Sequence, residues 1–177
     1  RLSGRKLDLV TSIAMFYDLE DPIGFARQVK ALLSEKGLWI FEMSYMPTML
    51  QMNSYDTICH EHLEYYSLAV IEYILRQAGL RVFNTSLNSI NGGSLRVYAT
   101  HVDQFGYRSE AFDANLKALR QAEFDLELDT DKPYRNFQAR IDRHKGALRK
   151  LMLELKKKGK RVHLYGASTK GNTILQW

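Results

Sequence analysis

The sequence has very little cysteine and no long apolar segment. A single cysteine, Cys59, occurs among the 177 residues. No disulfide can therefore form within the chain, which is typical of a protein in a reducing cytoplasm. No apolar run approaches the roughly 20 residues that a membrane-spanning helix requires. The first residues also lack the long apolar segment of a secretory signal. These absences predict a cytoplasmic protein without a membrane partner.

Low-complexity tracts, short-period repeats and two common nucleotide-binding motifs are lacking as well. Residues 166–172 read Gly-Ala-Ser-Thr-Lys-Gly-Asn, and their second glycine follows the lysine instead of preceding it as in a Walker loop. The segment does not read Gly-x-Gly-x-x-Gly either. The net charge is +5, and part of it lies in a basic run at residues 156–161, which is typical of a solvated helix end. We therefore expect no nucleic-acid partner.

The residues that are present predict an α/β fold. At 45% hydrophobic, the chain can bury the core of one domain or of one and a half. Residues 7–16 are largely apolar and predict a strand buried on both faces. Asp21 is a suitable N-cap, with Pro22 at the first position, for a helix over residues 23–33. Residues 38–43 predict a second buried strand. The short links favour a right-handed parallel crossover.

The next segments predict an antiparallel end to this sheet. Ser67 is a suitable cap for a helix over residues 68–77. Residues 81–87 and 94–101 alternate as strands and flank a glycine-containing loop at residues 88–93. A parallel sheet finished by an antiparallel hairpin resembles the second half of a class I methyltransferase domain. A likeness of fold alone says little about function.

The composition changes after residue 109. Two amphipathic helical stretches are expected at residues 111–126 and 134–158, followed by a strand at 161–165, a loop, and a helix from Thr173. The last of these elements predict the start of a second α/β unit. The predicted division is residues 1–102 for the Rossmann-like part, 103–158 for a helical connector and 159–177 for the beginning of a C-terminal α/β domain.

Residues 54–67 concentrate titratable groups. They include two of the five histidines, the only cysteine, three acidic residues and three tyrosines. General acid–base catalysis needs an imidazole oriented by a carboxylate or a phenol, and both are close in sequence. Histidines that are hydrogen-bonded structurally in a loop are an equally open interpretation. Cys59 and His62 have a spacing that suits a shared metal ion, but no other cysteine or paired histidine completes a tetrahedral set. We therefore expect no metal site.

Two further loops are candidates for ligand binding. Residues 166–172 combine a glycine turn with the start of a helix, where free backbone N–H groups and the helix dipole favour an anion. Ser168, Lys170 and Asn172 lie in this loop. Residues 88–94 form a hairpin turn whose amides and hydroxyls could also bind a polar ligand such as a sugar. A plain turn remains open as an interpretation of both loops.

Residues 55–68 resemble the His-Glu-His segment of the sugar C-methyltransferases, enzymes that act on nucleotide-linked deoxy-keto-sugars. Residues 12–22, 91–94 and 165–173 agree with the same family in order and spacing. The resemblance implies a protein of three parts: an N-terminal zinc-binding domain, a central S-adenosylmethionine-binding domain and a C-terminal α/β domain. The zinc site and the glycine-rich cofactor loop would then precede this chain, which would be inactive by itself.

The resemblance also implies a mechanism. A base removes the proton on the carbon next to the keto group of the sugar, and the enolate attacks the sulfonium methyl group. His62 is then the base, and Glu61 assists in proton handling or orientation. A tyrosine commonly precedes the His-Glu-His in this family. Cys59 stands there in this chain, so that hydrogen bond is missing or is supplied by Tyr55 or Tyr65.

Contacts to substrate and cofactor are expected elsewhere on the same surface. The expected substrate-binding residues are His60, Asn91, Ser94, Ser168, Lys170 and Asn172. The expected cofactor-binding residues are Ser12, Ala14 and Met15. Many members of the family have a histidine where this chain has Met15. This difference leaves a second acid–base role unfilled and O- or N-methylation open.

The sequence as a whole predicts part of an S-adenosylmethionine-dependent methyltransferase. The expected fold is α/β: the second half of a class I, Rossmann-like domain, a helical connection and the start of a second α/β domain. The expected partner is a nucleotide-sugar, and the protein is expected to be a monomer or a homodimer. A non-catalytic binding module on the same scaffold is the alternative, and it predicts packed histidines with no cleft beside them. Metal-dependent hydrolysis is a weaker third option.

Overall fold

The computed structural model describes residues 4–166 and 169–176, and within them a single mixed sheet organises the fold. Its strands lie in the order β1-β2-β4-β3. β1 and β2 are parallel, whereas β4 is antiparallel to both of its neighbours. The bounds are β1 (Leu7–Ile13), β2 (Leu33–Ser44), β3 (Leu80–Asn88) and β4 (Ser94–His101). The predicted parallel crossover and antiparallel hairpin are both confirmed.

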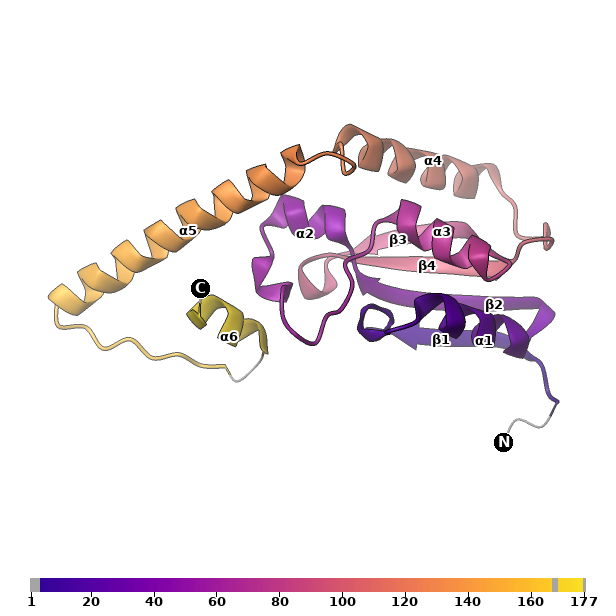
Figure 1. Ribbon diagram of the computed structural model, residues 1–177, viewed down its shortest axis with the longest axis horizontal. Helices are drawn as coiled ribbons and strands as arrows, with labels where there is room; N and C mark the ends of the chain where they lie inside the picture. Colours follow the sequence, from indigo (N-terminus) through magenta and orange to yellow (C-terminus); the bar gives the residue numbers. More distant parts are fainter. Residues whose placement is uncertain (1–3, 167–168, 177) are drawn as a thin grey trace.

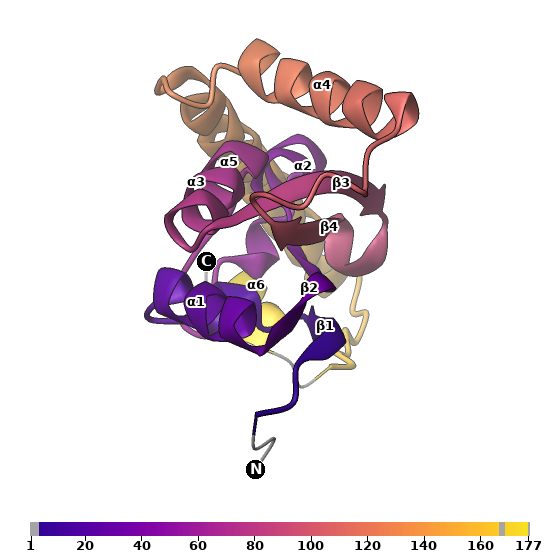
Figure 2. The ribbon, with the colours of Figure 1, turned by 90° about the vertical axis from the view of Figure 1, so that its right-hand side faces the viewer.

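Two helices cover one face of the sheet, α1 (Pro22–Leu32) and α3 (Leu68–Gln77) (Figures 1 and 2). Each begins at the predicted cap. The Asp21 carboxylate accepts a hydrogen bond of 2.8 Å from the Gly24 N–H, and the Ser67 hydroxyl accepts one of 3.3 Å from the Val70 N–H. Such caps satisfy backbone donors that have no partner within the helix. Local chemistry therefore fixes where both helices start.

β2 begins earlier than predicted, at Leu33 instead of residue 38. Gly37 consequently lies inside the strand and does not end α1. The pairing of β1 with β2 shifts register at this point, between Leu7 and Leu9. A Cβ atom on Gly37 would lie 2.8 Å from the Leu7 carbonyl oxygen. The glycine therefore permits a close approach of two backbones at an irregularity of the sheet.

β1 was predicted to be buried on both faces, and this prediction is wrong. Leu9 and Ile13 are each about half exposed, at 53% and 54%, whereas Ser12 is buried. β1 pairs only with β2 in the described residues and lies at the edge of the sheet. Because α1 and α3 cover only one face, the alternate side chains of β1 point to an open surface.

The core between sheet and helices is rich in aromatic rings. Trp39, Phe41 and Met43 alternate along β2 and point to the covered face. Phe16 is fully buried at the centre, 5.0 Å from the Phe41 ring and 5.3 Å from the Tyr66 ring, measured between centroids. Tilted aromatic pairs of this kind add to the free energy gained from burial. Through this contact with Tyr66, Phe16 packs the turn that follows β1 against the end of residues 54–67.

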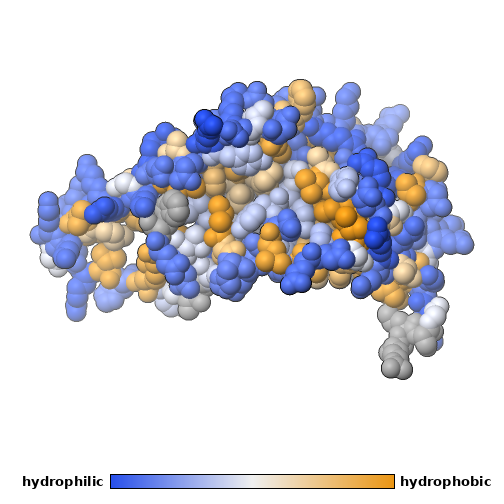
Figure 3. Space-filling view, viewed as in Figure 1, coloured by the Kyte–Doolittle hydropathy of each residue, from blue (hydrophilic) through white to orange (hydrophobic). Residues whose placement is uncertain are grey.

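The two helices predicted for the connector, which stays a prediction as a domain, are confirmed as α4 (Glu110–Asp125) and α5 (Lys132–Lys157). The first half of α5 packs on a helix that the sequence did not predict, α2 (Met46–Met52), through Phe137 and Ile141. The second half of α5 extends away from the sheet with both polar and apolar side chains exposed (Figures 1 and 3). No helix of the described residues is long and apolar enough to span a bilayer.

Two predictions for the end of the chain are wrong. Residues 161–165 do not form a strand and are exposed. A strand needs a neighbouring backbone to hydrogen-bond with, and the described part of the chain gives this segment none. The last helix, α6 (Thr169–Gln176), begins before the predicted Thr173. Part of the predicted loop is therefore its first turn.

A buried carboxylate joins the connector to the sheet. Glu123 of α4 is 6% exposed and accepts hydrogen bonds from the Tyr45 hydroxyl at 2.6 Å, from the Ala69 N–H at 3.1 Å and from the Leu68 N–H. It therefore caps the N-terminus of α3, where the helix dipole favours a negative charge. Burial, and next the hydrogen bond to Glu123, raise the pKa of the Tyr45 phenol, which stays protonated as a donor.

We expect Glu123→Ala to lower the free energy of unfolding by about 3 kcal/mol, because three donors, two of them buried, lose their acceptor. Glu123→Gln should cost less, since one acceptor oxygen remains. Urea unfolding followed by circular dichroism measures both changes. Gln121→Ala, at an exposed position of the same helix, is the matched control. Equal midpoints for Glu123→Ala and Gln121→Ala would contradict this role.

Candidate functional site

Residues 54–67 cross the carboxyl ends of β1 and β2. Tyr45, just after β2, forms an isolated parallel bridge with Tyr66. The Tyr17 carbonyl oxygen, just after β1, accepts hydrogen bonds from the Leu63 N–H at 3.0 Å and the Glu64 N–H at 3.1 Å. Ligands of open α/β sheets bind outside the carboxyl ends of parallel strands. The titratable segment therefore lies at the edge of the sheet where a ligand is expected.

His62 lies beside two tyrosine rings. Its imidazole is half-buried, 4.3 Å from the Tyr17 ring and 6.4 Å from the Tyr65 ring between centroids. Burial raises the pKa of both phenols. Asp18 and Cys59 raise that of Tyr17 further, and a hydrogen bond with the Cys59 backbone partly offsets the rise for Tyr65. Both tyrosines are therefore neutral near pH 7, and His62 is bounded by uncharged aromatic groups.

Glu61 and His60 are exposed and lie against α6. The Thr169 hydroxyl donates a hydrogen bond of 3.0 Å to the Glu61 carboxylate, and the Thr173 hydroxyl donates one of 3.3 Å to the Ile58 carbonyl oxygen. A cavity of about 360 Å³ separates the two segments. Its lining residues are Ile58, Cys59, His60, Thr169, Asn172, Thr173 and Gln176.

The structure thus brings together two groups of residues that the sequence places far apart. His60 and Asn172, both predicted to contact substrate, line the same cavity. Lys170 is half-buried in the first turn of α6. Ser168, predicted beside it, lies outside the described residues. The binding-module alternative predicted no cleft beside these histidines, and the cavity next to His60 does not agree with it.

Tyr55 and Tyr65, predicted as alternative partners of His62, have different surroundings. The Tyr55 hydroxyl forms a hydrogen bond of 2.9 Å with His144 Nδ1 on α5. Its ring belongs to a buried cluster with α2 and α5, and burial, then Asp56, raise the pKa of its phenol. The Tyr65 hydroxyl donates a 3.4 Å hydrogen bond to the Thr57 carbonyl oxygen. Of these two tyrosines, the structure places Tyr65 next to the His62 ring.

The three predicted cofactor residues follow one another at the end of β1. The Ser12 hydroxyl is buried and accepts a hydrogen bond of 3.1 Å from the Trp39 indole N–H. Ala14 is exposed and has a φ of 54°, which is uncommon for a residue with a Cβ atom. Its N–H donates to the Glu42 carbonyl oxygen at 2.9 Å. Met15 is half-buried. Such backbone strain often marks a ligand site.

The loop between β3 and β4 packs closely against α2. Gly93 has a φ of 121°, and a Cβ atom there would lie 2.0 Å from Thr48 Cγ2. The Ser94 hydroxyl is buried and donates a hydrogen bond of 2.9 Å to the Ile90 carbonyl oxygen. Asn91 lies in the short 3₁₀ turn Ile90–Gly92 of the same loop. The glycine is therefore needed both for its backbone conformation and for the close approach of α2.

Sequence reasoning missed two features of this site. Tyr17 was not selected, although its position directly after a predicted strand places it at the ligand-binding edge. The second is an ion pair of 2.7 Å between Glu42 of β2 and Arg96 of β4. Glu42 is 4% exposed, and its backbone carbonyl holds Ala14. A charged residue inside a strand predicted to be buried was the available signal.

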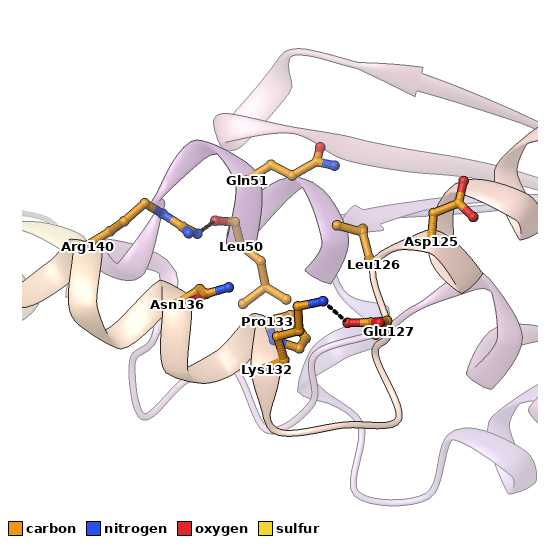
Figure 4. Close-up of a pocket in the computed structure, with 9 residues that line it drawn as sticks. All are labelled: Leu50, Gln51, Asp125, Leu126, Glu127, Lys132, Pro133, Asn136 and Arg140. Atoms are coloured by element: carbon orange, nitrogen blue, oxygen red, sulfur yellow. Dashed lines mark hydrogen bonds and ion pairs between the residues drawn. The ribbon is translucent and has the colours of Figure 1, made fainter.

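A second cavity, of about 390 Å³, lies between α2 and the turn that joins α4 to α5 (Figure 4). Lys132 and Glu127 form an ion pair of 2.5 Å at its rim, and the Arg140 guanidinium donates a hydrogen bond to the Leu50 carbonyl oxygen. None of the His-Glu-His residues lines it. Across the described residues, no group of three or more His, Cys, Asp or Glu could hold a metal ion.

Two family models match the sequence. Residues 89–177 match the family model described as C-methyltransferase C-terminal domain, and residues 2–85 match a methyltransferase domain. Over 147 residues the chain is 33% identical to C-methyltransferase NovU of Streptomyces niveus. The aligned region covers 83% of this chain and 34% of that protein. The chain thus spans about a third of the length of this curated relative.

Two solved structures are also similar, each at 9% identity over 55% of this chain and 27% of the other. They are described as "A Pericyclic Reaction enzyme", with a TM-score of 0.47, and "The structure of LepI complex with SAM", with a TM-score of 0.46. The family matches cover almost the whole sequence and include the sheet, the His-Glu-His segment and α6. This chain belongs to the C-methyltransferase family.

Proposed function

We propose that the protein is an S-adenosylmethionine-dependent C-methyltransferase that acts on a carbon next to the keto group of a nucleotide-linked sugar. The observation that carries the proposal is the position of His62. Its imidazole lies at the carboxyl ends of β1 and β2, between the Tyr17 and Tyr65 rings, and Glu61 precedes it. A half-buried imidazole next to neutral phenols is suited to accept a proton from carbon.

The described residues fit one wall of a cofactor site. Ala14 is exposed and Met15 is half-buried, and both follow the end of β1. The neighbouring Ile13 is also exposed, on the open face of the sheet. The Ser12 hydroxyl faces the core, so Ser12 would contribute its backbone to such a site. Bound S-adenosylmethionine would supply an electrophilic methyl group on sulfur.

The residues of this chain would carry out the proton transfer. His62 takes the proton from the carbon next to the keto group, and the electron pair of that C–H bond passes into the enolate. The enolate carbon would then bond to the methyl group as the methyl–sulfur bond breaks, with S-adenosylhomocysteine as the leaving group, and the keto group would be restored. Glu61 and Tyr65 orient the imidazole, and Tyr55 supports the segment through its packing against α5. Proton transfer by a positioned group typically contributes about 10²–10⁴-fold.

The nucleotide part of the substrate is proposed to bind at α6. Lys170, in its first turn, offers a positive charge, and the dipole of a helix N-terminus favours phosphate. His60 and Asn172 line the adjoining cavity and would contact the same ligand. Ser168 and Asn91 complete the proposed set. The Ser94 hydroxyl is buried and bonded to the Ile90 carbonyl oxygen, so Ser94 would shape the loop instead of contacting the ligand. The family match and the relative's name support methylation at carbon. The substrate class rests on the resemblance of residues 55–68 to the sugar C-methyltransferases.

In the full-length enzyme, we expect His62→Asn to lower kcat by about 10²-fold or more at saturating substrate, because the base that forms the enolate is lost. The same variant should stop the exchange of the substrate C–H proton with deuterium from solvent, which mass spectrometry detects. His163→Asn, at an exposed position distant in sequence, is the control. Near-normal turnover and exchange in His62→Asn would refute the base role.

We expect Lys170→Ala to weaken the binding of a nucleoside diphosphate such as UDP by about 10-fold, since a charge-assisted hydrogen bond is lost. Isothermal titration calorimetry measures the affinity. Lys117→Ala, an exposed lysine of α4, controls for the change in net charge. If both variants bind UDP and dTDP as the unaltered protein does, α6 does not hold the phosphates.

A further inference from the structure

Tyr17 is fixed more firmly than its place in a short turn suggests. It lies in the 3₁₀ turn Phe16–Asp18, which begins two residues after the left-handed Ala14, and is 8% exposed. The preceding Phe16 is fully buried among the rings of Trp39 and Phe41. The close-packed core therefore leaves this turn little freedom to move.

The backbone of Tyr17 restrains the residues that follow His62. Its carbonyl oxygen accepts hydrogen bonds from two successive N–H groups, those of Leu63 at 3.0 Å and Glu64 at 3.1 Å. On the other side of His62, its own N–H donates to the Cys59 carbonyl oxygen at 3.2 Å. The main chain is thus tied on both sides of the histidine, and one of the ties comes from Tyr17.

The side chain of Tyr17 restrains the imidazole itself. The two rings are 4.3 Å apart and tilted by 49°, which is the closest ring contact that His62 makes with a described residue. The Tyr65 ring lies 6.4 Å from the imidazole, at 62°. A ring packed this closely limits the side-chain rotation of His62. It also offers an aromatic surface to the imidazolium that forms on proton uptake.

We infer that Tyr17 is a positioning residue for His62: its ring holds the imidazole in the orientation needed to take the substrate proton, and its carbonyl group fixes the backbone that follows. The inference rests on the proposed function of His62 as the base. The aromatic ring is the important part, because the contact is between two closely packed, tilted rings. Tyr17→Phe should therefore behave like the unaltered protein, whereas an aliphatic residue should not.

The test compares Tyr17→Phe, Tyr17→Leu and Tyr17→Met in the full-length enzyme. Tyr17→Leu should lower kcat by about 10-fold or more with KM unchanged, because a misplaced catalytic group slows the chemical step. Tyr17→Met is the second aliphatic variant, since an unbranched side chain adapts to the space that remains. Thermal unfolding establishes which variants are folded. Tyr73→Leu, an exposed tyrosine of α3, is the matched control.

A second readout does not depend on turnover. The imidazole C–H signal of His62 in the proton NMR spectrum, identified by its loss in His62→Asn, is displaced by the ring current of Tyr17. It should keep its position in Tyr17→Phe and move toward that of an exposed histidine in Tyr17→Leu or Tyr17→Met. Full kcat and an unmoved signal in a folded aliphatic variant would overturn the inference while leaving the base role intact. Normal turnover of His62→Asn would instead remove the proposed function, with the NMR result still reporting the contact.

Discussion

The hydrogen bonds of the Glu123 carboxylate are the interaction on which the arrangement of this chain depends. One buried side chain of α4 meets Tyr45, which follows β2, and the first N–H groups of α3, which follow the His-Glu-His segment. A buried carboxylate is tolerated only when its oxygens are hydrogen-bonded, so the three parts must form together. The position of α4 is in this way coupled to the point where the chain leaves residues 54–67 and enters α3.

The turn after β1, which borders the candidate site, is fixed by a different type of interaction. Phe16 and Tyr66 are buried within one aromatic cluster, so the turn after β1 and the end of residues 54–67 share a core. Between these fixed points the chain can display polar and titratable side chains without losing its shape. This explains how His60 and Glu61 can be exposed while the segment that carries them is held in place.

The features predicted correctly from sequence are those that local chemistry decides. Asp21 and Ser67 cap their helices through contacts with residues three positions away, and the hairpin of β3 and β4 follows from alternation around a glycine-containing loop. The errors concern elements that depend on distant partners. The exposure of β1 depends on which strands and helices lie next to it. Residues 161–165 have strand-like composition but no neighbouring backbone among the described residues. The contact between α6 and the His-Glu-His segment joins residues too far apart for spacing to reveal it.

The same distinction bears on Cys59, which stands where a tyrosine was expected. The sequence offered Tyr55 or Tyr65 as replacements because they are near in number. In the fold, the Tyr55 hydroxyl is hydrogen-bonded to His144 on α5. The ring nearest to His62 is that of Tyr17, in the turn after β1. The Cys59 thiol is half-buried close enough to Tyr17 and Tyr65 to influence the pKa of both phenols. Cys59 lines the cavity beside His60, and the turn after β1 supplies an aromatic neighbour for the imidazole of His62. The ring that packs on the imidazole of His62 thus comes from a part of the chain that only the sheet topology brings near.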